Sequence, residues 1–352
     1  MTGNRKKEHL EICLNEDVSS EHNYWDDIKL IHRALPEMDM EDIDTTTLIF
    51  GKHLDAPIII SAMTGGYREA ESINKNLAEA ASELGIGMGV GSQRQAIEDR
   101  SLEGTYSVVK DYDIPLVIAN LGAPQFVKQG DKEPFTVEDA RRAMEMIDAD
   151  ILAIHLNFLQ EVVQPEGDMK ARGCLEEIQK LARFLPIIVK ETGAGISRGT
   201  AMVLRTSKIK GLDVGGLGGT SFSAVEHFRA KNEKNSGKER LGKTFWNWGV
   251  PTPVSLIVAN IGLPMIATGG IRSGLDAARA LALGASCAGI ASRILPFAKE
   301  SSQAVVEELK LIIGEIRAAM FLTSSKTIPE LEEANCVIVG ETAQWISGIE
   351  ML

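Results

Sequence analysis

The chain has 352 residues, 44% of them hydrophobic, and a formal net charge of −12. It is long enough for one large barrel or two modest domains, and its acidity argues against nucleic acid as a partner. Four cysteines without paired spacing, no signal-peptide core and no membrane-spanning stretch indicate a cytoplasmic protein, without a zinc site, a disulfide framework or membrane insertion.

The first 50 residues are polar and mixed. Arg5, Lys6 and His9 place cationic groups within one or two turns, a run that is usually a solvated terminus. The segment 39–47 is acidic and then threonine-rich, and it leads into residues 48–50. We predict a short strand there that closes the floor of a barrel.

From residue 57 a pattern recurs in which a short apolar, β-prone run ends in a small or polar residue and a helical stretch follows. Eight runs occupy residues 57–61, 86–91, 115–120, 151–156, 186–191, 211–215, 264–268 and 286–291. Most lie about 25–35 residues apart, the length of one βα unit. The stretches 70–84 and 275–283 are rich in helix-forming residues.

Apolar strands alternating with helices indicate a parallel sheet covered on both faces, and eight such units predict a (β/α)8 TIM barrel. An open doubly wound sheet is the alternative, but no G-x-G-x-x-G follows the first strand. We therefore expect one domain over residues 1–352, with residues 1–50 as an N-terminal extension. Residues 222–252 form a long insertion after strand six, which we expect to be lid-like. A helix over 305–320 should pack on the outside.

The residues directly after each strand form the mouth of such a barrel, where barrels do their chemistry. Here these positions carry hydroxyls, amides, glycines and a few cations, at residues 61–66, 91–94, 120–124, 155–161, 190–192, 215–220, 268–272 and 291–292. The packing of a barrel does not require polar residues and glycines after every strand. The pattern therefore favours a polar pocket.

Two segments late in the chain suggest a phosphate site. Gly269, Gly270 and Arg272 follow strand seven, and Ala291 and Ser292 follow strand eight. Barrels often bind phosphate at this position through backbone N–H groups, and arginine adds a bidentate donor.

Lys190 ends an apolar strand, so it is either paired with a carboxylate or directed at developing negative charge. We favour the second because Glu191 points to the opposite face.

His155 and Asn157 share one face of a strand. Glu161 is a candidate Mg²⁺ ligand, since Mg²⁺ takes one or two carboxylates together with substrate phosphates. Without a phosphorylated substrate it would be a surface glutamate.

With these positions assembled, the sequence resembles the type 2 isopentenyl-diphosphate isomerases, a flavin-dependent family. The resemblance covers most of the chain from Arg5 to Ile294. The motifs that carry it are Arg5-Lys6-x-x-His9, Ala62-Met63-Thr64-Gly65-Gly66, Gly91-Ser92-Gln93-Arg94, His155-x-Asn157-x-x-Gln160-Glu161, Lys190-Glu191-x-Gly193, Gly218-Gly219-Thr220-Ser221 and Gly269-Gly270-Ile271-Arg272.

The resemblance implies a TIM barrel that holds FMN, which must be reduced for turnover, with NADPH as the reductant. The residues that would contact the flavin are Ala62, Met63, Thr64, Ser92, Asn120, Lys190 and Thr220, with Gly270, Arg272, Ala291 and Ser292 around its phosphate and ribityl end. Those that would hold the substrate are Arg5, Lys6, His9, Ser92, Gln93, Arg94, His155, Asn157 and Gln160, and Glu161 would hold Mg²⁺. The family also implies a homo-oligomer, a tetramer or octamer.

The implied reaction interconverts isopentenyl and dimethylallyl diphosphate by moving a proton between two carbons. No strong side-chain nucleophile is visible, so we hypothesise that the flavin itself donates and accepts the proton. His155, Gln160 and Lys190 are the expected catalytic residues, with Lys190 stabilising an anionic reduced flavin. The alternatives are another FMN-dependent barrel oxidoreductase, such as a hydroxy-acid oxidase, and a non-catalytic ligand-binding barrel.

Overall fold

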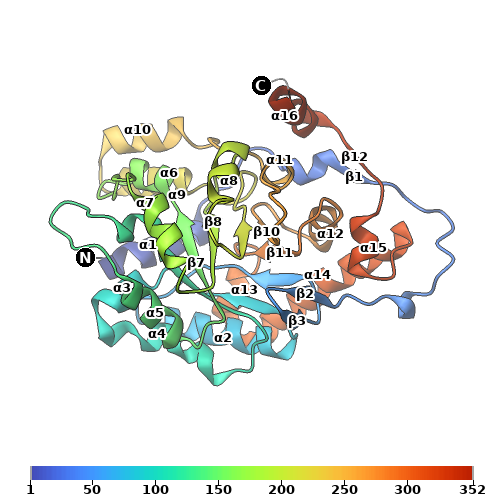
Figure 1. Ribbon diagram of the computed structural model, residues 1–352, viewed down its shortest axis with the longest axis horizontal. Helices are drawn as coiled ribbons and strands as arrows, with labels where there is room; N and C mark the ends of the chain where they lie inside the picture. The colour runs from blue at the N-terminus through green and yellow to red at the C-terminus, as the bar shows by residue number, and fades with distance from the viewer. Residues whose placement is uncertain (1, 351–352) are drawn as a thin grey trace.

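The computed structural model describes residues 2–350, and within them eight parallel strands close into a barrel in the order β10-β11-β4-β5-β6-β7-β8-β9. The strands are β4 (Ile58–Ile60), β5 (Gly87–Gly89), β6 (Val117–Gly122), β7 (Ile151–Leu156), β8 (Ile187–Glu191), β9 (Gly211–Asp213), β10 (Met265–Thr268) and β11 (Cys287–Ile290). Each overlaps one predicted run, so the predicted (β/α)8 fold is confirmed. Figure 1 shows these strands at the centre, surrounded by helices.

Side chains alternate along each strand, and this alternation builds the interior in layers. On β7, Ile151 and Ala153 belong to a buried apolar cluster inside the barrel, and His155 follows two residues later. On β8 the apolar residue is Ile188, and Lys190 follows in the same way. The interior is therefore apolar below and polar at the mouth.

A hairpin of β2 (Thr47–Ile49) and β3 (Lys52–Leu54) closes the floor, as predicted for residues 48–50. Ile49 and Leu54 join the apolar cluster inside the barrel, and Phe50 packs against it. Gly211 leaves room for this plug, because a Cβ there would lie 2.7 Å from a ring carbon of Phe50.

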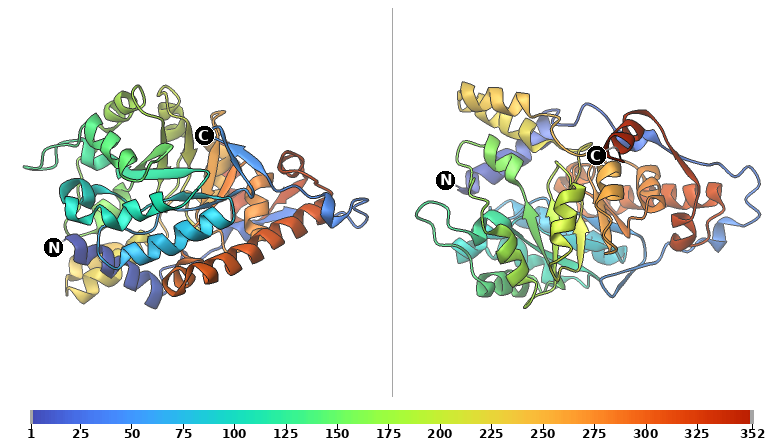
Figure 2. Two further views of the ribbon diagram at one scale, coloured as in Figure 1. Left: turned by 90° about the horizontal axis from the view of Figure 1, so that it is seen from below. Right: turned by 45° about the horizontal axis from the view of Figure 1, so that its top comes forward.

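The outer layer consists of helices that return the chain to the floor after each strand. The principal ones are α2 (Ala70–Glu83), α3 (Arg94–Glu98), α4 (Gly104–Ser107), α5 (Val137–Met146), α7 (Cys174–Leu181), α8 (Arg198–Leu204), α11 (Thr252–Val258), α12 (Gly274–Ala282), α13 (Leu295–Glu300) and α14 (Ser302–Thr323). As predicted for residues 305–320, α14 packs on the outside, between α2 and α12. In the left view of Figure 2 it runs beside α2 along the lower edge.

Two segments outside the regular repeat meet above the barrel mouth. The N-terminal helix α1 (Thr2–Asn15) packs on α9 (Phe222–Asn232), and α9 also contacts α6 (Phe158–Val163) and α10 (Ser236–Thr244). In the right view of Figure 2, α1 lies beside the yellow helices of the insertion. The segment 222–252 is thus folded as helices against α1.

The C-terminal part is tied to the N-terminal extension. Strand β1 (Ile28–Leu30) pairs with β12 (Cys336–Ile338), and α15 (Ile328–Glu332) and α16 (Gly340–Glu350) flank β12 in sequence. Asp27 accepts hydrogen bonds from the backbone N–H and hydroxyl of Thr342, at 2.9 and 2.8 Å. None of the helices described between residues 2 and 350 has the length and apolarity needed to cross a membrane.

The floor hairpin offers a matched test of this packing. Leu54 is 1% exposed inside the plug, whereas Leu48 of the same hairpin is 58% exposed. Truncating a buried leucine removes apolar contact and leaves a cavity, so Leu54→Ala should lower the free energy of unfolding by about 2–5 kcal/mol. Urea unfolding measures this loss. Leu48→Ala, the control, should change it by less than about 0.5 kcal/mol, and equal effects would contradict the plug.

Candidate active site

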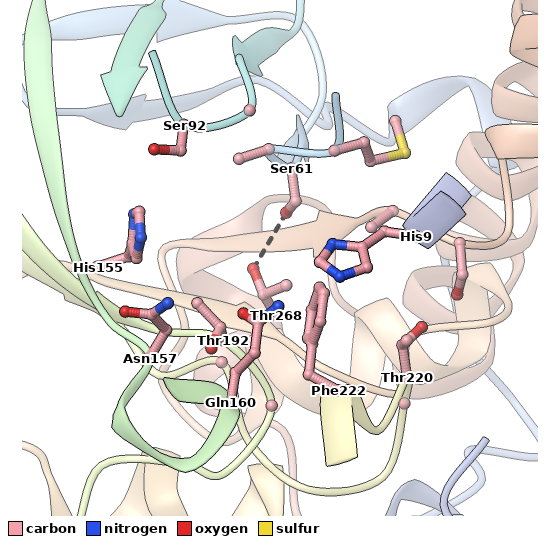
Figure 3. Close-up of a pocket in the computed structure, with 18 of the residues that line it drawn as sticks. His9, Ser61, Ser92, His155, Asn157, Gln160, Thr192, Thr220, Phe222 and Thr268 are labelled. Carbon is pink, nitrogen blue, oxygen red and sulfur yellow. Dashed lines mark hydrogen bonds between the residues drawn. The ribbon is translucent and has the colours of Figure 1, made fainter. Parts of the chain in front are cut away.

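The mouth of the barrel holds one continuous pocket, built largely from the upper interior layer. Residues of this layer that line it are Ser61, Asn120, His155, Lys190, Thr268 and Gly289. Each stands two positions after an apolar or small interior residue of its strand. Figure 3 shows Ser61 and Thr268 meeting in the pocket, their hydroxyl oxygens 3.1 Å apart, with His155, Asn157 and Gln160 on one side.

Pairing between β7, β8 and β9 places three titratable side chains in a row. His155 is in register with Lys190, and Lys190 with Asp213. Lys190 Nζ donates to the carbonyl of Glu191 at 2.9 Å and lies 3.7 Å from Asp213 Oδ2. Burial raises the pKa of Asp213, and the Lys190 ammonium opposes that rise. Lys190 therefore has a carboxylate partner, Asp213, which the sequence interpretation did not identify.

The hydrogen bonds of Asn120 determine which ring nitrogen of His155 carries the proton. Asn120 Nδ2 donates to the carbonyl of Val90 at 3.0 Å, so its Oδ1 is free to accept from His155 Nδ1 at 2.8 Å. Burial, followed by the positive charge of Lys190, lowers the pKa of His155 to about 3. The imidazole is thus neutral at physiological pH and carries its proton on Nδ1.

Glu161 is held from several directions at the start of α6. Its Oε1 accepts from Asn157 at 2.8 Å, and its Oε2 accepts from the Asp168 N–H at 2.7 Å and from the Gln164 amide. Burial raises the pKa of Glu161. Within residues 2–350 no group of three or more His, Cys, Asp or Glu side chains could hold a metal. A Mg²⁺ ion at Glu161 would therefore need oxygen ligands from a substrate or water.

Cations from α1 and from the loop after β5 meet on one side of the pocket. Lys6 Nζ donates to the carbonyl of Ser92 at 2.5 Å and to the Tyr106 hydroxyl at 2.7 Å. Burial, then the charges of Arg5 and Arg94, lowers the pKa of Lys6 to about 7. These three cations provide a site for a doubly or triply charged anion.

Carboxylates from the segment after α6 hold two of these cations. Arg94 pairs with Asp168 at 2.6 Å, and Arg5 lies 3.7 Å from Glu166. Residues 164–168 thus connect the cation cluster to Glu161, which accepts from the same segment.

Glu226 on α9 connects the insertion to the pocket. Its side chain is fully buried; its Oε1 lies 2.8 Å from His9 Nε2 and accepts from Gln160 at 3.2 Å, and its Oε2 accepts from Arg229 at 3.0 Å. Burial alone raises the pKa of Glu226, but His9 and Arg229 outweigh it and hold the pKa below its usual range. Figure 3 shows His9 and Gln160 extending into the pocket near Phe222.

The glycine loops after β9 and β10 form a close-fitting backbone cradle. Gly269 and Gly270 have φ of +117° and +76°, and a Cβ on Gly270 would lie 2.7 Å from the Gly218 carbonyl oxygen. Arg272 donates to that same carbonyl at 3.0 Å and lines the pocket, as do Ala291 and Ser292. Backbone amides, a guanidinium and a hydroxyl are suited to a phosphate.

Comparisons with known proteins agree with this geometry. The family model described as FMN-dependent dehydrogenase matches residues 11–110 and 252–338, more than half of the chain. The isopentenyl-diphosphate delta-isomerase of Thermoplasma acidophilum is 49% identical, covering 98% of this chain and 99% of that one. The enzyme of the same name from Archaeoglobus fulgidus is 46% identical, covering 98% of each. The chain belongs to the isopentenyl-diphosphate delta-isomerase family. The predicted family is confirmed.

Solved structures show the same barrel. A mandelate oxidase superposes with a TM-score of 0.63 at 18% identity, covering 96% of this chain and 98% of that one. A Pediococcus acidilactici lactate oxidase gives 0.66 at 15% identity, covering 96% and 94%. At these identities the likeness concerns the fold alone. The dehydrogenase match omits residues 111–251, which in this member of the isomerase family carry His155, Gln160 and Lys190.

In this isomerase-family chain the pocket gathers almost every residue that the sequence singled out. Lining it are Arg5, Lys6, His9, Ala62, Met63, Thr64, Ser92, Arg94, Asn120, His155, Asn157, Gln160, Glu161, Lys190, Thr220, Gly270, Arg272, Ala291 and Ser292. Gln93 is the exception. It is fully buried, donates to the Ala143 carbonyl at 2.7 Å and accepts from the Asn120 N–H at 2.9 Å. The structure therefore gives Gln93 a role in joining β6 to α5, away from the pocket.

The sequence interpretation did not identify two carboxylates near the pocket, Asp213 and Glu226, and it considered Glu191 only as a residue of the opposite strand face. The carboxylate of Glu191 accepts from the backbone N–H groups of Thr192, Gly193 and Gly195, at 2.6, 2.7 and 3.1 Å. It thereby shapes the loop after β8. Period two along residues 211–213 marks Asp213 as inward-facing, whereas Glu226 lies in an insertion whose fold the barrel pattern does not predict.

The pocket suits the FMN that the family implies. Its cradle offers phosphate donors, and Ala62 and Met63 add apolar surface to the pocket that Lys190 and Asn120 also line. Asn157 Oδ1 is buried and accepts no hydrogen bond from the described residues, so a polar ligand group would satisfy it. A flat ring with a polar edge and a phosphate tail matches this donor set.

The buried imidazole should make stability depend on pH. The pKa of His155 is about 3 in the folded chain and about 6.5 when unfolded. Between these values the unfolded chain binds the extra proton, so stability is lost as the pH falls, by at most about 1.4 kcal/mol per pH unit. We expect His155→Gln to lose less stability than the wild type between pH 6.5 and pH 4.5. Urea unfolding at both pH values measures this, and equal losses would contradict a buried neutral imidazole.

Proposed function

We propose that the protein interconverts isopentenyl and dimethylallyl diphosphate by a proton shift between two allylic carbons, with reduced FMN bound in the barrel mouth. The observation that carries this is a pocket with two separate anion sites. One is the glycine cradle with Arg272, and the other is the cluster of Arg5, Lys6 and Arg94. A flavin phosphate suits the first and a substrate diphosphate the second. The isopentenyl-diphosphate delta-isomerases at 45–49% identity support this assignment.

The diphosphate would exchange the internal carboxylate partners of the cation cluster for its own oxygens. Asp168 pairs with Arg94, and Glu166 with Arg5. Both carboxylates lie in the segment that follows Glu161, the residue proposed to hold Mg²⁺. Glu161 would hold the Mg²⁺ ion, which would supply further positive charge to the diphosphate.

Gln160 and His9 are proposed to orient the prenyl group and to assist the proton shift. Both share Glu226 Oε1, at 3.2 and 2.8 Å, which restricts their side chains. The reduced flavin supplies the acid and base of the reaction when it is bound. Lys190 contributes a buried positive charge beside it, and neutral His155 contributes a hydrogen-bonding surface.

The proposal also covers the reductant, the cellular location and the oligomeric state of the enzyme. NADPH is proposed as the reductant and the cytoplasm as the location, which all four cysteines as free thiols would suit. A homo-oligomer, tetramer or octamer, is proposed from the family resemblance.

A hydroxy-acid oxidase is the main alternative, because the oxidases named above share the fold. Such chemistry requires a base whose pKa lies near the working pH. Between residues 2 and 350, two imidazoles line this pocket. His155 has a pKa of about 3, which makes it a weak base, and His9 is held by Glu226 at 2.8 Å. A non-catalytic binding barrel is the other alternative, and it predicts a purified protein that binds no flavin.

An anaerobic assay tests the proposal directly. Protein with FMN, Mg²⁺, dithionite or NADPH, and isopentenyl diphosphate should form dimethylallyl diphosphate, because reduced flavin and metal complete the pocket. Omitting the reductant should abolish the product. Product formation without flavin, or oxidation of a 2-hydroxy acid in its place, would refute the proposed reaction.

Gln160 provides a second test. Gln160→Asn withdraws the amide by one methylene from Glu226 Oε1 and from the pocket, so turnover should fall by about 100-fold, the scale of a lost proton-transfer contribution. Flavin absorbance should show that FMN remains bound. The control is Gln179→Asn on α7, outside the pocket, which should leave turnover unchanged. Turnover within twofold of wild type in Gln160→Asn would exclude this role.

A further inference from the structure

The buried pair of Lys190 and Asp213 is not explained by the folding of the barrel alone. Both side chains are almost inaccessible, at 10% and 6% exposure, and the two residues are directly opposed on β8 and β9. Removing two charges from water costs free energy, so apolar residues at this pair would serve stability equally well. Retaining a charged pair at the mouth indicates that one of the charges is used there.

The two partners differ in their access to the pocket. Lys190 lines it, whereas Asp213 is not among the lining residues. Asp213 is therefore set back from the pocket surface, where its carboxylate lies 3.7 Å from the Lys190 ammonium and also bonds Thr268 and the Gly215 backbone. In this arrangement a ligand meets the ammonium first, and the carboxylate is shielded from it.

The other charged groups near Lys190 do not replace Asp213. Glu191 has its carboxylate turned to backbone N–H groups of its own loop. His155 on β7 is neutral. Arg94 on α3 is positive, and so is Lys6 on α1 below its pKa of about 7; both would oppose a further positive charge. Of the described groups around Lys190, Asp213 is the carboxylate that lies within 4 Å of its ammonium.

We propose that Asp213 is a positioning residue that keeps Lys190 protonated inside the pocket, so that the barrel presents a fixed positive charge to the anionic ring of reduced FMN. This inference rests on the proposed function, because it places the flavin beside Lys190. Without Asp213 the buried ammonium would have no counter-ion. It would then lose its proton readily, since burial disfavours the charged form.

A competing effect points in the opposite direction. The negative charge of Asp213 also repels an anionic flavin, so its removal could tighten binding if repulsion dominated. The position of the lysine favours the first effect: Lys190 lines the pocket, whereas Asp213 does not and lies 3.7 Å from the ammonium. We therefore expect loss of the lysine charge to outweigh relief of repulsion.

The test compares the affinities of oxidised and reduced FMN for wild type, Asp213→Asn, Lys190→Met and the double variant, at pH 7 to 9. We expect Asp213→Asn to bind reduced FMN at least tenfold more weakly than wild type at pH 8, with a smaller effect on oxidised FMN. A tenfold preferential loss lowers the two-electron midpoint potential by about 30 mV. The proposal predicts that this deficit relative to wild type grows as the pH rises.

Non-additivity separates positioning from a general structural role. If Asp213 acts through Lys190, the double variant should bind reduced FMN no more weakly than Lys190→Met. Asp27→Asn is the matched control, since it removes another buried carboxylate that bonds Thr342 outside the pocket, and it should leave FMN affinity unchanged. Tighter or unchanged binding of reduced FMN by Asp213→Asn, or additive losses, would overturn the inference.

A further measurement uses only proteins in which Asp213 is unchanged, so its result does not depend on whether Asp213→Asn folds. Proton uptake on adding reduced FMN should be the same for wild type and Lys190→Met, because the proposal has the Lys190 charge present before the ligand binds. One additional proton taken up by the wild type would overturn the inference. If the wild type binds no FMN at all, the proposed function fails first, so the two failures are distinguishable.

Discussion

The alternation of side chains along short strands in a closed barrel is the constraint on which the rest of the structure depends. Closure gives every strand an inner face, and period two assigns its residues to levels. Ile188 and Lys190 stand one level apart on β8, as do Ile118 and Asn120 on β6. The lower level is sealed by the β2–β3 hairpin. The upper level is thereby left as a polar surface on a rigid apolar base.

An acidic protein can bind a diphosphate only if it concentrates positive charge locally. Here the cations come from segments far apart in sequence, α1 and the loop after β5, and carboxylates of residues 166 and 168 neutralise two of them. Lys190 is neutralised in the same way by Asp213. Arg5, Arg94 and Lys190 thus each have a counter-ion until a ligand replaces or adds to it, which limits the cost of desolvation. Pairing with a carboxylate is thus found both in the cation cluster and at Lys190.

The insertion and the N-terminal helix complete the site from above. Glu226 links His9 of α1 to Gln160 of α6 through one carboxylate oxygen. A proposed lid role for residues 222–252 therefore has a physical basis, since movement of α9 would alter two proposed substrate contacts together. Gly269 and Gly270 contribute to the site by having no side chain: their positive φ and close backbone neighbours leave no room for a Cβ.

The sequence by itself determined the barrel, its floor strand and the residues that line its mouth. Strand periodicity and βα spacing are local properties of the sequence, and the residues that follow each predicted strand are the ones that reach the mouth. The sequence also led to the isomerase family through motifs that the full-length relatives confirm. Only the tertiary structure decided that Gln93 joins α5 to β6 rather than lining the pocket, and that Asp213, Glu226, Glu166 and Asp168 are partners of the proposed site residues. Those pairings depend on strand register and on the docking of α1 and α9, which bring together residues as far apart as 9 and 226. Such contacts arise from closure of the whole chain, and no local pattern encodes them.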